Sequence, residues 1–145
     1  SQEHLEVLRI ALKDGTIDCI ATDHAPHHFE SKDCEYELAA NGISGLETAV
    51  PVVMSLVQQG VLDIKTMIEK MSLGPAQVLG IDRGRLQIGA VADLTIIDPD
   101  AVRIVDPARF YSQGKNNPYK GLEYTGWPFA TIVAGKIVAR EGIIV

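Results

Sequence analysis

The sequence predicts a mixed α/β fold in which an α/β part is followed by a β-rich part. An amphipathic helical pattern near the N-terminus is followed, within a few residues, by a short apolar run rich in β-branched side chains. Further helical patterns follow. Beyond Gly80 the pattern changes to short apolar runs separated by turn residues, which is typical of a small antiparallel sheet.

Composition excludes several classes of protein. With 145 residues, of which 46% are hydrophobic and 22% charged, the chain falls in the ordinary globular range. Its net charge of -6 gives no basic surface for nucleic acid or anionic lipid. Its long apolar stretches, such as residues 49–57, are interrupted by Pro51 and Ser55 and fall short of the ~20 residues that a membrane span needs.

The cysteines and the N-terminus set further expectations. Cys19 and Cys34 are the only cysteines, and neither context suggests a disulfide framework, so we expect a reducing cytoplasm. No basic segment followed by an apolar core precedes the first helix, so no secretory signal is predicted. The chain begins at Ser1 rather than Met, which suggests a processed end or the cut edge of a longer protein.

The first helix and strand are predicted from capping and periodicity. A helix is expected over residues 1–12, with Ser1 as its N-cap, leucines on one stripe, and Asp14-Gly15 at its end. Residues 17–22 then predict a short buried strand. Asp23 and the histidines after it would lie at the C-terminal mouth of this strand, where α/β folds bind ligands.

Three more helices are predicted after a long polar loop over residues 28–42. The first covers residues 46–59, with a kink or a late start caused by Pro51. The second runs from an N-cap at Asp63 to Met71, and the third covers residues 75–79.

The remaining chain predicts strands and turns. Short strands are expected over residues 93–97, 102–105, 131–133 and 136–139, with turns at Asp98-Pro99, Gly135-Lys136 and Glu141-Gly142. A loop rich in Gly, Asn, Pro and aromatic residues is expected between Arg109 and Pro128. We place a boundary near residues 80–85, which divides the chain into parts 1–82 and 83–145.

Asp23 is the first candidate for chemistry. A carboxylate at a strand mouth, backed by apolar residues and flanked by imidazoles, can bind a divalent metal or transfer a proton. The alternative is that Asp23 caps the following turn and the histidines are ordinary loop residues, since Asp at a strand end commonly caps a turn.

Other catalytic classes have little support. Asp23, the nearby histidines and Cys34 could form a closed structural zinc site, but they lack the paired ligand spacing of such sites, so Cys34 is expected to be an incidental thiol. The sequence contains no P-loop, no dinucleotide-binding glycine pattern and no Ser-His-Asp order.

Six motifs stand out along the chain: Asp14-Gly15-Thr16-Ile17-Asp18-Cys19-Ile20-Ala21-Thr22-Asp23-His24-Ala25-Pro26-His27, Gly45-Leu46-Glu47-Thr48, Leu73-Gly74-Pro75-Ala76, Gly89-Ala90-Val91-Ala92-Asp93-Leu94, Gly114-Lys115-Asn116-Asn117-Pro118 and Thr131-Ile132-Val133-Ala134-Gly135-Lys136. They resemble the dihydroorotase family of the amidohydrolase superfamily, in its bacterial type I branch, and this resemblance rests on all six motifs. It therefore covers essentially the whole chain. Dihydropyrimidinases and allantoinases share the Asp-His core and are the alternatives.

The resemblance implies both fold and reaction. The chain would form the C-terminal part of a (β/α)8 TIM-type barrel, whose last strand is residues 17–22, together with part of a small β-sandwich. The reaction would be the reversible, zinc-dependent interconversion of N-carbamoyl-L-aspartate and dihydroorotate in pyrimidine biosynthesis. One or two zinc ions would provide a hydroxide near neutral pH and polarise the ring carbonyl.

The resemblance also implies roles for individual residues. Asp23 would bind zinc and act as general acid/base, and His27 would hold the substrate carboxylate. Asn41 and Gly42 fall where the family contacts the substrate with loop backbone, although an apolar residue usually stands at the position of Asn41. His24 would support the site without binding metal. His28 and His4 are given no role.

Most of the metal ligands of the family lie upstream of anything in this chain. The resemblance therefore implies a C-terminal fragment that binds zinc weakly and does not turn over dihydroorotate alone. The expected partners are a small-molecule substrate, a second copy in a homodimer and, in some relatives, aspartate transcarbamoylase. A non-catalytic scaffold for that transcarbamoylase is the alternative of a different class.

Overall fold

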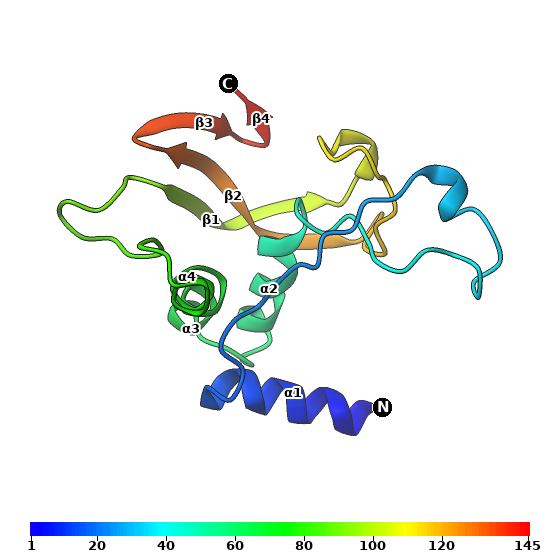
Figure 1. Ribbon diagram of the computed structural model, residues 1–145, viewed down its shortest axis with the longest axis horizontal. Helices are drawn as coiled ribbons and strands as arrows, with labels where there is room; N and C mark the ends of the chain where they lie inside the picture. The colour runs from blue at the N-terminus through cyan, green and yellow to red at the C-terminus, as the bar shows by residue number, and fades with distance from the viewer.

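The computed structural model describes all residues from 1 to 145, and they form a mixed α/β structure (Figure 1). The helices are α1 (Gln2–Asp14), α2 (Ala49–Gln58), α3 (Ile64–Ile68) and α4 (Gly74–Leu79), with a π-helical turn η2 (Glu69–Leu73) and single 3₁₀ turns η1 (Phe29–Ser31) and η3 (Pro107–Arg109). The strands are β1 (Leu94–Ile104), β2 (Glu123–Val133), β3 (Lys136–Arg140) and β4 (Ile143–Ile144). They pair in the order β1-β2-β3-β4, each antiparallel to the next.

The predicted helix caps are confirmed. The Ser1 side chain accepts a hydrogen bond from the His4 amide, and Gly15 ends α1 with a φ of 90°. The Asp63 carboxylate accepts from the Thr66 amide at 2.7 Å and so caps α3. Helix α2 begins at Ala49, which places Pro51 in its first turn, where a missing amide hydrogen costs no helical hydrogen bond.

The prediction of two separate helices over residues 63–71 and 75–79 is wrong, because α3, η2 and α4 form one continuous helical run. Pro75 is the physical reason why the middle of this run, η2, is π-helical and not α-helical. The Gly74 amide donates to Glu69 O, and Pro75 has no amide hydrogen to donate. The Lys70 carbonyl is therefore available to a partner outside the helix.

That partner is the segment predicted as a strand over residues 17–22, which is extended here but forms no regular strand. A strand needs a neighbour, and the only bridge nearby is an isolated parallel one between His24 and Ile43. The segment is instead anchored to the helical run. The Ile20 amide donates to Lys70 O at 2.9 Å, and the buried Lys70 Nζ donates to Ile17 O.

The sheet corrects two further predictions. The runs on either side of Asp98-Pro99 belong to the single strand β1, which has an irregular register at this point instead of a turn. The loop predicted up to Pro128 ends earlier, because β2 begins at Glu123. The β2–β3 turn is confirmed, with positive φ at Ala134 and Gly135, and so is the turn at Glu141-Gly142.

The core of this chain is small. Val53, Met54 and Met67 form its buried cluster between α2 and α3, and only 17 of 145 residues are buried. The accessible surface is 9983 Å², whereas a self-contained protein of this mass exposes about 7,300 Å². Much of the surface thus lacks the covering that a complete domain provides. No helix has both the length and the apolarity to cross a bilayer.

Gly126 provides a test of the packing between α2 and β2. A Cβ at this position would lie 2.3 Å from Met54 Cγ, and its φ is +89°. We expect Gly126→Ala to lower the free energy of unfolding by about 2–5 kcal/mol, the sum of backbone strain and overpacking. Urea denaturation of the complete protein measures this change.

Gly135→Ala is the matched control. Gly135 has a similar φ of +78°, but nothing lies within 4 Å of its added Cβ. This variant should lose only the backbone term of about 1–2 kcal/mol. Equal losses in the two variants would show that the contact with Met54 contributes nothing.

Candidate active site

Asp23 lies at the end of the anchored segment 17–22, and its side chain is exposed. Its φ is 45°, in the left-handed region that few residues other than glycine adopt. Aspartate tolerates this region better than most residues, and the turn directs the chain out of the extended segment. The Thr22 hydroxyl accepts a hydrogen bond from the His24 amide at 3.3 Å across this turn.

The His24 ring is hydrogen-bonded to the backbone just before α2. Its Nδ1 accepts hydrogen bonds from the amides of Gly45 at 3.1 Å and Leu46 at 3.3 Å. Nδ1 therefore carries no proton, and any ring proton is on Nε2. The Ala25 amide donates to Ile43 O at 2.9 Å, so the turn after Asp23 and the chain before α2 are joined by three hydrogen bonds.

The structure brings together three of the four predicted site residues. His27 Nε2 donates to Asn41 O at 2.8 Å, and the next residue, Gly42, packs against Ala25. A Cβ on Gly42 would lie 2.5 Å from Ala25 Cβ, and its φ is +100°, so glycine is required at this close approach. Lys32 Nζ closes the loop by donating to Gly42 O at 2.8 Å and to Ala40 O.

The contact between His27 and Asn41 uses the Asn41 carbonyl and leaves its exposed side chain free to face solvent. The Asp23 side chain forms no hydrogen bond with this pair. Its assigned roles as metal ligand and proton carrier stay predictions, as do the substrate contacts of His27, Asn41 and Gly42.

The residues of this chain do not form a metal site by themselves. No three His, Cys, Asp or Glu side chains gather closely enough to hold an ion. Asp23 offers one carboxylate, whereas zinc sites use three or four protein ligands. Cys19 and Cys34 are both free thiols, and Cys34 is exposed on the polar loop.

Glu47 is a residue of this region that the sequence patterns did not single out as functional. Its Oε1 accepts from the Ser112 amide at 2.8 Å, while Oε2 is buried without a partner. Burial raises the pKa of the Glu47 carboxyl, but the hydrogen bonds from Ser112 and from the Glu47 backbone amide outweigh it, so the pKa is lowered from its usual 4.5. The only prior signal was its place in the Gly45–Thr48 motif.

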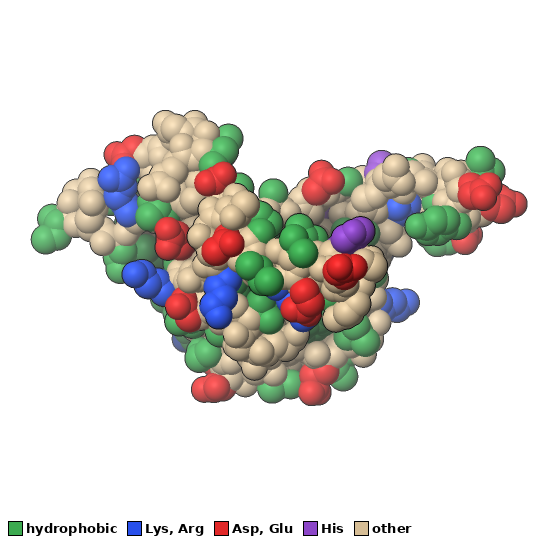
Figure 2. Space-filling view, turned by 90° about the horizontal axis from the view of Figure 1, so that it is seen from below, with side chains coloured by type: hydrophobic (Ala, Val, Ile, Leu, Met, Phe, Trp, Pro, Cys, Tyr) green, Lys and Arg blue, Asp and Glu red, His purple; other side chains and the backbone are tan.

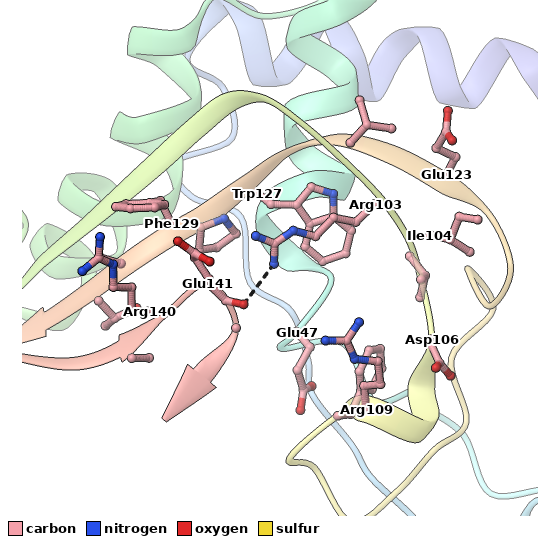
Figure 3. Close-up of a pocket in the computed structure, with 18 of the residues that line it drawn as sticks. Glu47, Arg103, Ile104, Asp106, Arg109, Glu123, Trp127, Phe129, Arg140 and Glu141 are labelled. Atoms are coloured by element: carbon pink, nitrogen blue, oxygen red, sulfur yellow. Dashed lines mark hydrogen bonds between the residues drawn. The ribbon is translucent and has the colours of Figure 1, made fainter. Parts of the chain in front are cut away.

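The groove shown in Figure 3 lies elsewhere. It has a volume of about 980 Å³, opens over one face of the sheet and is lined in part by Glu47. Arg103 stacks on Trp127 with its guanidinium carbon 5.8 Å from the ring centre, and Arg140 stacks on Phe129 at 5.2 Å. Asp23 and His27 do not line this groove. Its form is that of an uncovered sheet face.

The polar loop over residues 28–42 extends away from the rest of the molecule (Figure 1). Figure 2 shows acidic and apolar side chains together at the tip of the arm on the right. Phe29, Tyr36 and Leu38 on this loop are each more than 70% exposed. Exposed aromatic and aliphatic side chains so close to the His27–Asn41 contact indicate that the loop also lacks a covering neighbour.

Comparison with known proteins places these features in a family. The amidohydrolase family model matches residues 1–138. A dihydroorotase of Geotalea daltonii is 52% identical over 139 residues, which are 96% of this chain and 33% of the relative. A dihydroorotase of Pelotomaculum thermopropionicum is 55% identical over 138 residues, which are 94% of this chain and 32% of the relative. The chain thus spans about a third of the length of these curated relatives.

Solved structures give the same picture of the fold. An L-hydantoinase (dihydropyrimidinase) from Arthrobacter aurescens superposes with a TM-score of 0.89 at 36% identity, over 95% of this chain and 32% of that one. A D-hydantoinase (dihydropyrimidinase) from Thermus sp. superposes with a TM-score of 0.81 at 30% identity, over 97% of this chain and 32% of that one.

The lowered pKa of Glu47 predicts a pH-dependent contribution to stability. Because the unfolded chain binds this proton more tightly, the stabilisation is complete above the unfolded pKa near 4.5 and is lost as the pH falls through the lower folded pKa. Glu47→Gln should therefore be destabilised at pH 7, and its difference from the wild type should shrink below pH 4.5. Urea denaturation at several pH values measures it.

Glu37→Gln makes the same chemical change at an exposed position of the polar loop. Its denaturation midpoint at pH 7 should match the wild type. A Glu47→Gln difference that stayed constant down to the acid limit would contradict a role for the charge.

Proposed function

This chain belongs to the amidohydrolase family, and from that premise we propose that it forms the C-terminal part of a dihydroorotase. The observation that carries the proposal is the Asp23–His27 turn, locked against residues 41–46, in a chain that is 52% and 55% identical to two dihydroorotases over nearly its whole length. The reaction is the reversible cyclisation of N-carbamoyl-L-aspartate to dihydroorotate in pyrimidine biosynthesis.

Asp23 acts as the general acid/base of this reaction. In the ring-opening direction, a water oxygen bonds to the ring carbonyl carbon, the C–N bond breaks, and the proton released by the water passes through Asp23 to the departing nitrogen. Exposure of Asp23 at the end of an anchored segment supports this role, since the backbone that carries it is held in place and its carboxylate is open to a substrate.

His27 binds the substrate carboxylate, assisted by the backbone of Asn41 and Gly42. Its Nε2–H is held by Asn41 O, which fixes the ring orientation. Because Nε2–H is already used, the ring donates to the substrate carboxylate from Nδ1 when the imidazole is protonated, and that hydrogen bond is charge-assisted. The close packing of Gly42 on Ala25 keeps the Asn41 carbonyl within reach of His27.

Asp23 would also provide one oxygen ligand to a zinc centre of one or two ions, whose other ligands would lie outside these 145 residues. Two features support an origin in a longer protein: the relatives are about three times as long, and the chain exposes far more surface than a self-contained domain. Residues 1–82 would complete a (β/α)8 barrel. Residues 83–145 would complete a β-sandwich, with strands from elsewhere in the protein covering the groove over the sheet.

A hydantoinase-type activity is the second candidate, favoured by the TM-score of 0.89 to the Arthrobacter aurescens enzyme. Dihydroorotate carries a carboxylate that dihydrouracil and unsubstituted hydantoin lack, so comparing turnover of these substrates separates the two. The predicted homodimer and the predicted complex with aspartate transcarbamoylase rest on the sequence resemblance alone. A His-x-His pair in the preceding sequence would favour the enzyme over a scaffold.

Asp23→Asn in the complete protein tests the proton transfer. We expect kcat for dihydroorotate to fall by about 10²- to 10⁴-fold, the usual contribution of a positioned acid/base. Zinc content measured on the same sample separates loss of proton transfer from loss of metal. Near-normal turnover with metal retained would contradict the assignment.

His27→Ala tests recognition of the carboxylate. KM for dihydroorotate should rise by about 10- to 100-fold, as expected for a lost hydrogen bond to a charged group. His28→Ala is the control, because His28 is exposed and its ring contacts only Glu30. Equal KM values in the two variants would remove His27 from the binding site.

A further inference from the structure

A segment from the C-terminal part of the chain packs directly against the candidate site. Ser44, which is fully buried, donates from its amide to Asn116 O at 2.9 Å and from its hydroxyl to Gly114 O at 2.6 Å. Gly114 also lies against Pro26, so closely that a Cβ at this position would be 2.8 Å from Pro26 Cβ. Residues 112–117 thus contact both chain segments that form the site.

Asn117 connects these contacts. Its Nδ2 donates to Ser44 O at 2.8 Å and to Thr48 Oγ1 at 3.0 Å, and its Oδ1 accepts from the Tyr119 amide at 2.9 Å. Asn117 is 6% exposed and Thr48 is 1% exposed. A buried amide whose two ends are both satisfied fixes the relative position of the groups that it joins, because breaking it would strand polar atoms without water.

We call these hydrogen bonds of Ser44, Thr48 and residues 114–119 the network. Only Ile43 separates Ser44 from Gly42, in the part of the site assigned to substrate binding. Ser44 follows Ile43, whose carbonyl accepts from the Ala25 amide, and Ile43 follows Gly42 and Asn41. His27 is held in turn by Asn41 O. A shift of Ser44 would therefore move the carbonyl that orients His27.

Asp23 has a further anchor. It continues directly from residues 17–22, where Ile20 and Ile17 are hydrogen-bonded to the main chain and side chain of Lys70. On its other side, His24 accepts from the amides of Gly45 and Leu46, which follow Ser44. Loss of the Asn117 contacts therefore leaves Asp23 with its Lys70 anchor, while the segment that holds His27 loses one of its ties to residues 112–117.

We propose that Asn117 is a positioning residue for substrate binding, which holds the Asn41–Ser44 segment, and through it His27, in the orientation that receives the substrate carboxylate. The proposal rests on the proposed function in its choice of substrate. It adds that a residue in the sheet-forming part of the chain, which touches no substrate, sets the affinity of the site for its ligand.

The test compares Asn117→Ala with Asn116→Ala in the complete, zinc-loaded protein. The two asparagines are adjacent, but Asn116 is exposed and enters the network only through its backbone. We expect Asn117→Ala to raise KM for dihydroorotate about tenfold, with kcat within about twofold of wild type, and Asn116→Ala to change neither.

This split separates positioning from stability, since partial unfolding lowers the active fraction and hence the apparent kcat but leaves KM unchanged. If Asn117→Ala does not fold, Ser44→Ala removes only the hydroxyl contact to Gly114 O and should raise KM in the same direction. An unchanged KM in the folded variant would overturn the proposal.

Hydrogen exchange gives a readout that needs no substrate. The amides of Ala25 and Ser44 both donate within the network, so Asn117→Ala should exchange them about tenfold faster than Asn116→Ala does. If the wild type does not act on dihydroorotate, the proposed function fails, while faster exchange would still show that Asn117 holds this segment. Equal exchange in the two variants would overturn the positioning role itself.

Discussion

The hydrogen bonds between Lys70 and the extended segment 17–22 are the constraint on which the Asp23 region depends. Lacking a neighbouring strand, that segment satisfies its backbone from a helix: Ile20 donates to Lys70 O, and Lys70 Nζ donates to Ile17 O. Lys70 O is available because Pro75 cannot donate within the π turn. Pro75, which is distant from Asp23 in the sequence, thus determines how the chain before Asp23 is held. Gly74 completes the fit, since a Cβ there would lie 2.5 Å from Asp18 O.

The helix ends that depend on a few adjacent residues were predicted correctly from the sequence. The caps at Ser1 and Asp63 and the glycine end of α1 follow from side-chain hydrogen bonds and a positive φ, which depend on a few adjacent residues. The continuity of α3, η2 and α4 could not be predicted in this way, because Pro75 normally suggests a break and its effect here depends on a distant partner. The early start of β2 was hidden for a similar reason. Gly126 and Pro128 weaken the strand pattern, yet the close approach to Met54 requires that glycine.

In the candidate site, too, the local features were predicted and the contacts between distant residues were not. The turn at Asp23 and the histidines were visible in the sequence, and the resemblance supplied roles for them. The contact of His27 with Asn41 O spans 14 residues, and that of Asn117 with Ser44 spans 73. No periodicity or spacing encodes pairs so far apart. The groove over the sheet could not be predicted from the sequence either. It lies over Trp127 and Phe129. Neither the hydrophobic pattern nor the turn residues of a strand indicate what packs on its faces.

The left-handed conformation of Asp23 connects the two anchors. A φ of 45° in a non-glycine residue costs of order 1–3 kcal/mol and persists only where the surroundings determine it. On the N-terminal side, Lys70 fixes residues 17–20; on the C-terminal side, His24 and Ala25 are bonded to residues 43–46, which Asn117 holds in turn. Relaxing Asp23 would require one of these hydrogen-bonded contacts to break. The fold therefore holds an exposed carboxylate in a conformation that its own backbone disfavours.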